Sequence, residues 1–382
     1  MNCIYNGKIL IDGEFVDNKA ILFDTSIINV IDENDINNYS IKSKIDAKGK
    51  YISPGFIDVH IHGYKGNDTM DGDIESLRKI SRDVAENGVT SFLPTTMTMD
   101  IPVIRKALDT IQSIMKDETY GAEVLGTHLE GPFICKKYKG AQPEKYIIQP
   151  SEEVIKGYEE IIKIITIAPE VNGALEFIEK YTKEYGIRFS IGHSNATYDE
   201  ALKGIDKGIC SATHLFNAMT GLHHRDPGAI GAVMNTDIMC ELIADTIHVN
   251  HALFNLLVRI KGLDKILLIT DAMMGAGLND GEYDLGGQKV YMKNGRCVLE
   301  DGTIAGSSLK LNKAIYNFTK YTDYELSKVL GLATINQAKY IGVDDRKGSL
   351  DIGKDADIVI LNDNLEIDLT IGKGKVIYEK SN

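Results

Sequence analysis

Two histidines separated by one residue, His60 and His62, end the first long apolar run in the middle of the chain. In a β-strand, side chains two residues apart point to the same face, so both imidazoles could reach one ion. Imidazole is a borderline ligand that suits zinc, iron or nickel. Taken alone, such a pair is more often structural, so it indicates a metal site only in the company of further ligands.

Three more side chains of ligand type end other apolar runs: Glu130, His193 and His214. One carboxylate and two imidazoles leave a coordination position for water, which is typical of a catalytic rather than a structural metal site. Glu130 in isolation could equally be a helix-capping or surface residue. We therefore predict a divalent metal such as zinc, iron or nickel, with one ion or two per subunit depending on whether His60 and His62 join the set.

Asp271 follows a further apolar run, from Leu267 to Thr270. An aspartate in this position is either a helix N-cap or a positioned general acid/base. A metal lowers the pKa of bound water from about 15.7 to about 7, so a nearby carboxylate could take its proton at neutral pH and deliver it to a leaving amine. We predict Asp271 as the catalytic residue.

Eight strand-like runs position these side chains, and longer charged stretches compatible with helices separate most of them. The runs cover residues 52–61, 90–95, 123–129, 161–168, 187–192, 209–215, 239–244 and 265–270, and the helix-compatible stretches cover 73–87, 101–116, 173–185 and 252–263. The link between the sixth and seventh runs is long and rich in glycine, and shows no clear helix. Because parallel strands need crossovers, this alternation predicts an α/β fold, a (β/α)₈ TIM barrel whose strand ends meet at one mouth.

Both ends of the chain have a different texture, with short strands broken by turn signals such as Asn6-Gly7, Asp12-Gly13 and Gly372-Lys373-Gly374. We predict one small β-sandwich domain formed by residues 1–52 and 346–382, and a barrel over residues 53–345.

Charge and cysteine content exclude several classes of partner. The 382 residues carry a formal net charge of −13, which argues against nucleic acid or an anionic membrane as a partner. The five cysteines are scattered without a CxxC pair, so neither a disulfide framework nor a thiolate zinc site is expected. The chain shows no secretory signal and no apolar stretch of ~18 residues. We expect a cytoplasmic protein.

Ordered motifs carry a family resemblance along essentially the whole chain. Pro-Gly-Phe-Ile-Asp-Val-His-Ile-His-Gly (54–63) resembles the opening barrel motif of the amidohydrolase superfamily. Further motifs lie at 88–95, 128–133, 168–170, 192–196, 213–219, 226–232, 270–273, 304–307 and 353–359. Together they resemble the N-acetylglucosamine-6-phosphate deacetylase family within it. Glu130 stands where many other members of the superfamily use a carboxylated lysine.

The resemblance implies hydrolysis of N-acetylglucosamine 6-phosphate to glucosamine 6-phosphate and acetate. It implies Glu130, His193 and His214 as the primary metal ligands and Asp271 as the acid/base. His60 and His62 match a second metal site that only some members keep, which implies a two-metal centre of Zn²⁺ or Fe²⁺ here.

The resemblance also implies a set of substrate contacts. Asn217, the backbone of Ala218, and Arg225 match positions that contact the sugar phosphate, and His248 matches a contact to a sugar hydroxyl. A guanidinium suits bidentate phosphate binding, although a loop arginine can also be merely solvated. In the family this arginine can reach the neighbouring subunit, which implies a homodimer. The backbone of Ile304, Ala305 and Gly306 resembles the wall over the sugar.

Three positions depart from the family pattern. Gln142, which follows Ala141 at the predicted substrate site, replaces a histidine that polarises the acetyl carbonyl in many members. An amide can still donate a hydrogen bond, though a neutral one. Thr246 replaces a usual glycine and Gln337 a usual proline, and neither change removes a ligand.

Other functions stay open at this point. The chain could act on N-acetylgalactosamine 6-phosphate or on several amino-sugar phosphates, because sequence cannot separate epimers. A dihydroorotase or deaminase is disfavoured by the missing strand-four lysine and by the arginine loop. An inactive scaffold would have lost ligands, and a glycosidase with paired carboxylates would not explain four histidines at strand ends.

Overall fold

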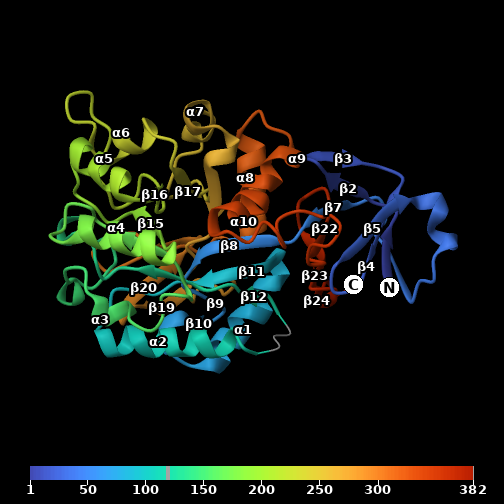
Figure 1. Ribbon diagram of the computed structural model, residues 1–382, viewed down its shortest axis with the longest axis horizontal. Helices are drawn as coiled ribbons and strands as arrows, with labels where there is room; N and C mark the ends of the chain where they lie inside the picture. Colours follow the sequence, from blue (N-terminus) through green and yellow to red (C-terminus); the bar gives the residue numbers. More distant parts are fainter. Residues whose placement is uncertain (118–120, 382) are drawn as a thin grey trace.

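A curled parallel sheet surrounded by helices and a separate sheet domain make up the protein in a computed structural model, which describes residues 1–117 and 121–381 (Figure 1). The parallel strands are β8 (Phe56–Ile61), β11 (Val89–Pro94), β13 (Thr127–Glu130), β14 (Ile162–Ile167), β15 (Arg188–Ile191), β16 (Ile209–Ala212), β17 (Met239–Ile243) and β18 (Ile266–Ile269). Every residue of β8, β11, β13 and β18 is buried, as expected for strands covered on both faces.

The parallel strands pair in sequence order. Strands β13 to β18 form one six-stranded sheet, and β8, β11 and the short β12 (Glu123–Val124) form another. Isolated parallel bridges join the two sheets at both edges, between Thr95 and His128 and between Ile61 and Ala272. The backbone N–H of Asp271 also donates to the carbonyl of His60 at 2.9 Å. The strand ends that carry the predicted ligands therefore meet on one side of the sheet.

Two of the predicted runs are each divided by a glycine. The run 52–61 covers two strands, the end of β7 (Tyr51–Pro54) and all of β8, and Gly55 separates them. Strand β7 belongs to the small sheet domain. A Cβ on Gly55 would lie 2.2 Å from the Thr90 hydroxyl, so a larger residue there would displace Thr90. The run 123–129 splits into β12 and β13 at Gly126, whose φ of 144° is a conformation that favours glycine.

Helices connect most of the parallel strands. The α-helices are α1 (Ile74–Asp83), α2 (Ile101–Ile114), α3 (Glu152–Ile155), α4 (Ala174–Tyr185), α5 (Tyr198–Lys207), α6 (Gly228–Met234), α7 (Ala252–Lys261), α8 (Leu311–Tyr321), α9 (Leu326–Val329) and α10 (Ile335–Ile341). The 3₁₀ helices are η1 (Glu33–Asn38), η2 (Thr69–Asp71), η3 (Val84–Asn87), η4 (Lys136–Tyr138), η5 (Glu144–Tyr146), η6 (Leu263–Lys265) and η7 (Leu330–Ala333). The link between the sixth and seventh strands, expected to lack a helix, contains α6. All of its residues except Met234 are buried, so it has no polar face from which a helical period could be read.

The separate sheet domain combines strands from both ends of the chain, and both termini lie there (Figure 1). One sheet has the order β5 (Ile27–Asp32), β4 (Lys19–Phe23), β1 (Asn2–Tyr5), β6 (Ser43–Asp46). The other has the order β24 (Lys375–Glu379), β23 (Ile367–Gly372), β22 (Ile358–Leu361), β7, β2 (Lys8–Ile11), β3 (Glu14–Val16). Ile4, Ile21, Ile52 and Ile360 share one hydrophobic cluster that draws on both sheets.

A small antiparallel sheet between β18 and α8 was not expected from the sequence. It consists of β19 (Gly281–Leu285), β20 (Gln288–Lys293) and β21 (Arg296–Val298). Its two tight turns are Gly286-Gly287 and Asn294-Gly295, which all have positive φ. Such dipeptides are the strongest short hairpin signals, so the sequence did contain the information. A second small ribbon pairs β9 (Gly63–Tyr64) with β10 (Asn67–Asp68).

An ion-pair network joins the parallel sheet to the C-terminal segment. Lys347 is 1% exposed, and its ammonium lies 2.8 Å from Glu123 on β12, 2.9 Å from Asp355 and 2.6 Å from Asp357. Arg346 donates through both guanidinium NH groups to Glu123, at 3.0 and 3.2 Å. Burial raises the pKa of Glu123, but Lys347 and Arg346 outweigh that effect and hold the pKa at about 2.

We expect Glu123→Gln to destabilise the protein at neutral pH by about 3 kcal/mol, from the shift in the Glu123 pKa between 4.5 and about 2. Because the pKa is lower in the folded state, this stabilisation is present above pH 4.5 and is lost as the pH falls from 4.5 towards 2. Thermal unfolding of both proteins at pH 7 and pH 3 checks this. Glu152→Gln, at an exposed pair with Lys180, is the control. A gap between the melting temperatures that stays equal at both pH values would contradict the prediction.

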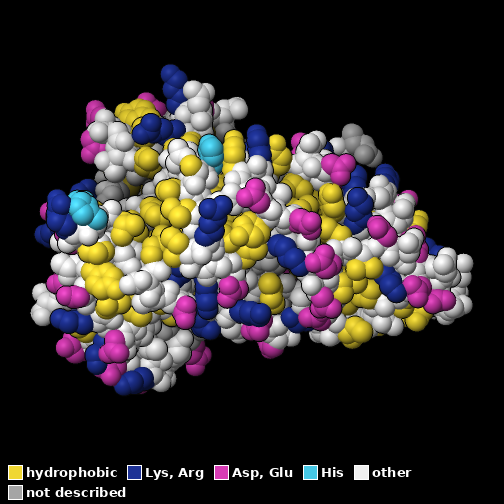
Figure 2. Space-filling model, turned by 90° about the horizontal axis from the view of Figure 1, so that it is seen from above, with side chains coloured by type: hydrophobic (Ala, Val, Ile, Leu, Met, Phe, Trp, Pro, Cys, Tyr) yellow, Lys and Arg dark blue, Asp and Glu magenta, His cyan; other side chains and the backbone are white. Residues whose placement is uncertain are grey.

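The surface carries mixed charge. Basic and acidic side chains alternate over the face shown in Figure 2, with hydrophobic side chains between them. The helices within the described residues are all too short or too polar to cross a membrane.

Candidate active site

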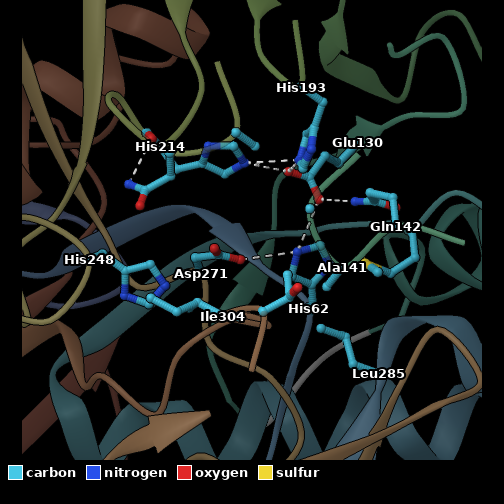
Figure 3. A pocket seen from close by; sticks show the side chains of 16 residues that line it. His62, Glu130, Ala141, Gln142, His193, His214, His248, Asp271, Leu285 and Ile304 are labelled. Atoms are coloured by element: carbon cyan, nitrogen blue, oxygen red, sulfur yellow. Dashed lines mark hydrogen bonds and ion pairs between the residues drawn. The ribbon is translucent and has the colours of Figure 1, made fainter. Parts of the chain in front are cut away.

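A cavity of about 270 Å³ opens at the carboxyl ends of the parallel strands (Figure 3). It brings together twelve of the residues that the sequence singled out: His62, Glu130, Ala141, Gln142, His193, His214, Asn217, Ala218, His248, Asp271, Ile304 and Gly306. Met97, Leu285, Thr303 and Gly140 complete the lining. Leu285 comes from the unexpected small sheet, which therefore supplies part of the cavity wall.

Backbone conformation turns three of these side chains into the cavity. His193, His214 and Asp271 follow β15, β16 and β18, and have positive φ values of 47°, 30° and 50°. Non-glycine residues seldom adopt this conformation, which costs on the order of 1–3 kcal/mol and clusters at functional sites. The strain is repeated at the ends of three different strands, which indicates that the surrounding fold holds these side chains for a function.

The predicted primary ligands lie in contact with one another. Glu130 Oε1 lies 3.1 Å from His193 Nε2 and 3.0 Å from His214 Nε2, and the two Nε2 atoms are 3.1 Å apart. All three residues are buried. Two imidazole nitrogens and a carboxylate oxygen at these distances suit a shared cation, and the three form one of the groups able to hold a metal ion.

The His60–His62 pair lies directly beside this set. The two Nε2 atoms are 3.4 Å apart, and His62 Nε2 lies 3.3 Å from Glu130 Oε2. His60, His62 and Glu130 form a second group with metal-ligand geometry. Glu130 thus contacts both pairs of histidines, and its Oε1 also lies 3.6 Å from His60 Nε2.

The opposite ring nitrogens show which atoms are free to bind a metal. His193 Nδ1 lies 3.0 Å from the Tyr138 carbonyl, and His62 Nδ1 lies 3.2 Å from the Thr95 carbonyl. A carbonyl oxygen only accepts, so each Nδ1 carries the hydrogen and each neutral ring keeps its lone pair on Nε2. Both Nε2 atoms face the cavity, as the ligands of a metal must.

The electrostatics of the cluster favour positive charge. Burial raises the pKa of Glu130, but His60, His193 and His214 outweigh it, so the pKa lies well below its usual value. Burial lowers the pKa of His60, but Glu241, Glu130 and Asp271 raise it to about 9. The buried carboxylates thus stabilise the protonated form of the histidines. A metal cation would balance the same negative charge.

Asp271 faces both histidines of the second group. Its Oδ1 lies 3.2 Å from His62 Nε2 and 3.5 Å from His60 Nε2. Burial raises the pKa of Asp271, but the neighbouring His60 and His62 lower it below the usual value. The carboxylate is therefore ionised at neutral pH and is able to accept a proton at the cavity surface.

Gln142 lines the cavity and also contacts Glu130, one of the predicted metal ligands. Its Oε1 accepts a hydrogen bond from the backbone N–H of Thr98 at 2.7 Å, which fixes the orientation of the amide. Its Nε2 therefore points the other way and donates to Glu130 Oε2 at 2.7 Å. The amide holds the carboxylate that is predicted to bind a metal, a role that the sequence did not suggest for this position.

The remaining predicted substrate contacts divide into two groups. His248 lines the cavity, and its Nδ1 lies 2.6 Å from the Asp245 carboxylate. Ala305 is fully buried behind Ile304 and Gly306, so only its neighbours reach the cavity. Arg225 is exposed and outside the lining, and its guanidinium lies 2.7 Å from His224 Nε2. Within one chain, the fold does not bring Arg225 to the site.

Sequence reasoning missed two buried acids behind the cavity. Glu241, on β17, contacts His60 Nδ1 at 2.9 Å, and Asp58, on β8, accepts from the Thr270 hydroxyl at 2.6 Å. Both are fully buried. The available signal was a single charged residue inside an otherwise apolar run, because an acid in such a strand is seldom buried without a partner.

Comparison with known proteins decides the family. The model of the amidohydrolase family matches residues 51–377. This chain belongs to the amidohydrolase family. It is 38% identical to the N-acetylglucosamine-6-phosphate deacetylase of Bacillus subtilis (strain 168), over 97% of this chain and 95% of the relative. It is 36% identical to the N-acetylgalactosamine-6-phosphate deacetylase of Escherichia coli O157:H7, over 85% of this chain and 87% of the relative.

A crystal structure of N-acetylglucosamine-6-phosphate deacetylase from Pasteurella multocida superimposes on this amidohydrolase with a TM-score of 0.93, at 30% identity and over 100% of both chains. The resemblance read from the ordered motifs is thereby confirmed.

Proposed function

We propose that this amidohydrolase removes the acetyl group of N-acetylglucosamine 6-phosphate by hydrolysis, yielding glucosamine 6-phosphate and acetate. The observation that carries the proposal is the convergence of Glu130, His193, His214 and Asp271 on one cavity at the strand ends. The match to the deacetylase of Bacillus subtilis along nearly the whole chain supports the same reaction.

We propose Glu130, His193 and His214 as the primary ligands of a divalent metal, zinc or iron, and His60 with His62 as ligands of a second. The donor set of imidazole and carboxylate suits either ion. When bound, such a metal lowers the pKa of water and polarises a carbonyl oxygen.

Asp271 then accounts for the movement of protons. Its ionised carboxylate accepts a proton from the attacking water as the water oxygen bonds to the acetyl carbon. The C–N bond breaks, and Asp271 returns this proton to the departing amine nitrogen. The second proton of the water stays on the acyl product, which is released as acetic acid and ionises to acetate in solution. The other product is the free amino sugar, and Asp271 is again ionised.

The sugar side of the cavity is proposed to consist of Ala141, Gln142, Asn217, the backbone of Ala218, and His248, with the backbone of Ile304, Ala305 and Gly306 as a wall. Because Asp245 accepts from His248 Nδ1, the other ring nitrogen, Nε2, is left for a contact with a sugar hydroxyl. We propose that Arg225, which is exposed, contributes to the cavity of a second subunit in a homodimer.

If Arg225 binds the phosphate, Arg225→Ala should lower kcat/KM for the phosphorylated substrate by about 10- to 100-fold, the range expected for a charge-assisted hydrogen bond. Turnover of unphosphorylated N-acetylglucosamine should not change. Arg259→Ala, at an exposed position on α7, is the matched control. An equal loss for both sugars would refute the phosphate role.

We further propose that the parallel strands close into an eight-stranded barrel over residues 53–345, supported by the bridges at Thr95–His128 and Ile61–Ala272. Residues 1–52 and 346–382 are proposed as the β-sandwich, although β7 continues to Pro54. A cytoplasmic location is proposed because the five cysteines are free thiols.

Direct assay of acetate release from N-acetylglucosamine 6-phosphate tests the proposed reaction. The same assay with N-acetylgalactosamine 6-phosphate tests the alternative raised by the Escherichia coli relative. No acetate from the first substrate, in protein supplied with zinc or iron, would overturn the assignment. A higher kcat/KM for N-acetylgalactosamine 6-phosphate would make that sugar phosphate the assigned substrate.

A further inference from the structure

Glu241 is a fully buried carboxylate in the middle of β17 that the proposed reaction does not use. Its Oε2 accepts a hydrogen bond from His60 Nδ1 at 2.9 Å and one from the backbone N–H of His214 at 3.2 Å. Its Oε1 has no hydrogen-bond partner among the described residues. One carboxylate oxygen therefore connects two predicted ligands that come from opposite sides of the site.

The group His60, His128 and Glu241 also has metal-ligand spacing, but its hydrogen bonds exclude a third metal. His128 Nδ1 lies 3.1 Å from the Val59 carbonyl, which only accepts, so this nitrogen carries a hydrogen and has no lone pair for a metal. His128 Nε2 lies 2.7 Å from the Thr166 hydroxyl. Both ring nitrogens of His128 are therefore engaged.

The arrangement is costly for stability alone. A carboxylate without solvent contact loses its hydration, and Oε1 recovers no hydrogen bond in exchange. This imbalance indicates that Glu241 serves the site next to it.

We propose that Glu241 is a positioning residue that holds His60 with Nε2 directed at Glu130 and Asp271, and so sets the affinity of the metal position formed by His60 and His62. The inference rests on the proposed two-metal centre. The carboxylate keeps the hydrogen on Nδ1, leaves the lone pair on Nε2, and raises the basicity of the ring. Its second hydrogen bond, to the backbone of His214, ties the two ligands into one rigid unit.

The test is a titration of the metal-depleted full-length protein with Co²⁺, followed by visible absorption, in wild type and in Glu241→Gln. The amide of glutamine has nearly the same shape and can still accept through one oxygen, so the substitution removes mainly the charge. His60→Ala identifies the binding step that belongs to the His60–His62 position. We expect Glu241→Gln to weaken Co²⁺ binding at the His60–His62 position by about 10- to 100-fold. Co²⁺ affinity at the other position, formed by Glu130, His193 and His214, should change by much less.

A double-mutant cycle separates positioning from general destabilisation. If Glu241 acts through His60, adding Glu241→Gln to His60→Ala should weaken the remaining cobalt step no more than the small change that Glu241→Gln alone causes at that step. Circular dichroism and thermal unfolding check that each variant is folded. Should Glu241→Gln not fold, Glu241→Asp, which withdraws the carboxylate from His60 by one methylene, replaces it with the same expectation.

Three outcomes would overturn the proposal: unchanged affinity at both steps, equal weakening of both steps, or a loss at the remaining step of the double mutant that exceeds the change caused by Glu241→Gln alone. A wild-type protein that binds one Co²⁺ only would also overturn it, together with the second metal position. Acetate release by that protein would still support the deacetylase function, so the two failures are distinguishable.

Discussion

Replacing Asp271 by asparagine should lower kcat by about 10²–10⁴-fold, the usual contribution of a general acid/base, while the metal content stays at the wild-type level. The carboxylate oxygen lies 3.2 Å from His62 Nε2 but outside the Glu130–His193–His214 group, so the primary ligands remain intact. An amide cannot take the proton of the attacking water, and it has none to return to the leaving nitrogen. Steady-state kinetics and elemental analysis of the same preparation measure both quantities.

Asp264→Asn is the matched control for this substitution, because Asp264 is an exposed aspartate near the start of β18. It should leave kcat unchanged. Near-normal turnover by Asp271→Asn would refute the acid/base role. A loss of metal together with a loss of turnover would instead make Asp271 a ligand.

Glu130→Gln should have the second large effect, a loss of more than about 100-fold in affinity for the primary metal, with a matching loss of acetate release. Changes to residues behind the ligands typically cost 10- to 100-fold, and removal of a ligand charge should exceed that. Glu130 supplies the negative charge beside His193, His214 and His62, all within 3.3 Å. Metal per chain, measured after dialysis against a graded chelator series, checks this expectation.

Glu170→Gln provides the comparison at a half-buried carboxylate that follows β14, the next strand along the chain. Glu170 accepts hydrogen bonds from the Ser194 hydroxyl at 2.8 Å and the Asn195 backbone at 2.6 Å, and lies outside the ligand groups. Its variant should keep its metal. If Glu130→Gln also kept wild-type metal affinity, the primary site would have to be placed elsewhere.

The residue types of the predicted ligands could be found from the sequence because the carboxyl ends of buried strands can be recognised there. Apolar runs of four to eight residues that stop at a histidine or an acid indicate strands with a polar carboxyl end. In a parallel sheet those ends lie on one side, which is enough to gather His62, Glu130, His214 and Asp271 without knowing any coordinate. The matching family and relatives confirm the reaction class that this gathering implied.

The wall of the cavity was harder to predict. Leu285 reaches the site from a small sheet whose Gly-Gly and Asn-Gly turns were visible in the sequence but had no apolar run long enough to attract notice. The helix α6 was missed for the opposite reason, because a helix buried on nearly all sides shows no period.

The sequence by itself determined which residue types stand at the strand ends, because alternation of apolar and charged stretches is a local property. Its ordered motifs, which are also local, carried the resemblance to the family and with it the expected reaction. Only the tertiary structure decided what lies behind the ligands. The contacts of Gln142 with Glu130 and of Glu241 with His60 join residues 12 and 181 positions apart. Such contacts depend on how strands twist and close around the site, which no local pattern records, and on the left-handed turns that aim His193, His214 and Asp271 inward.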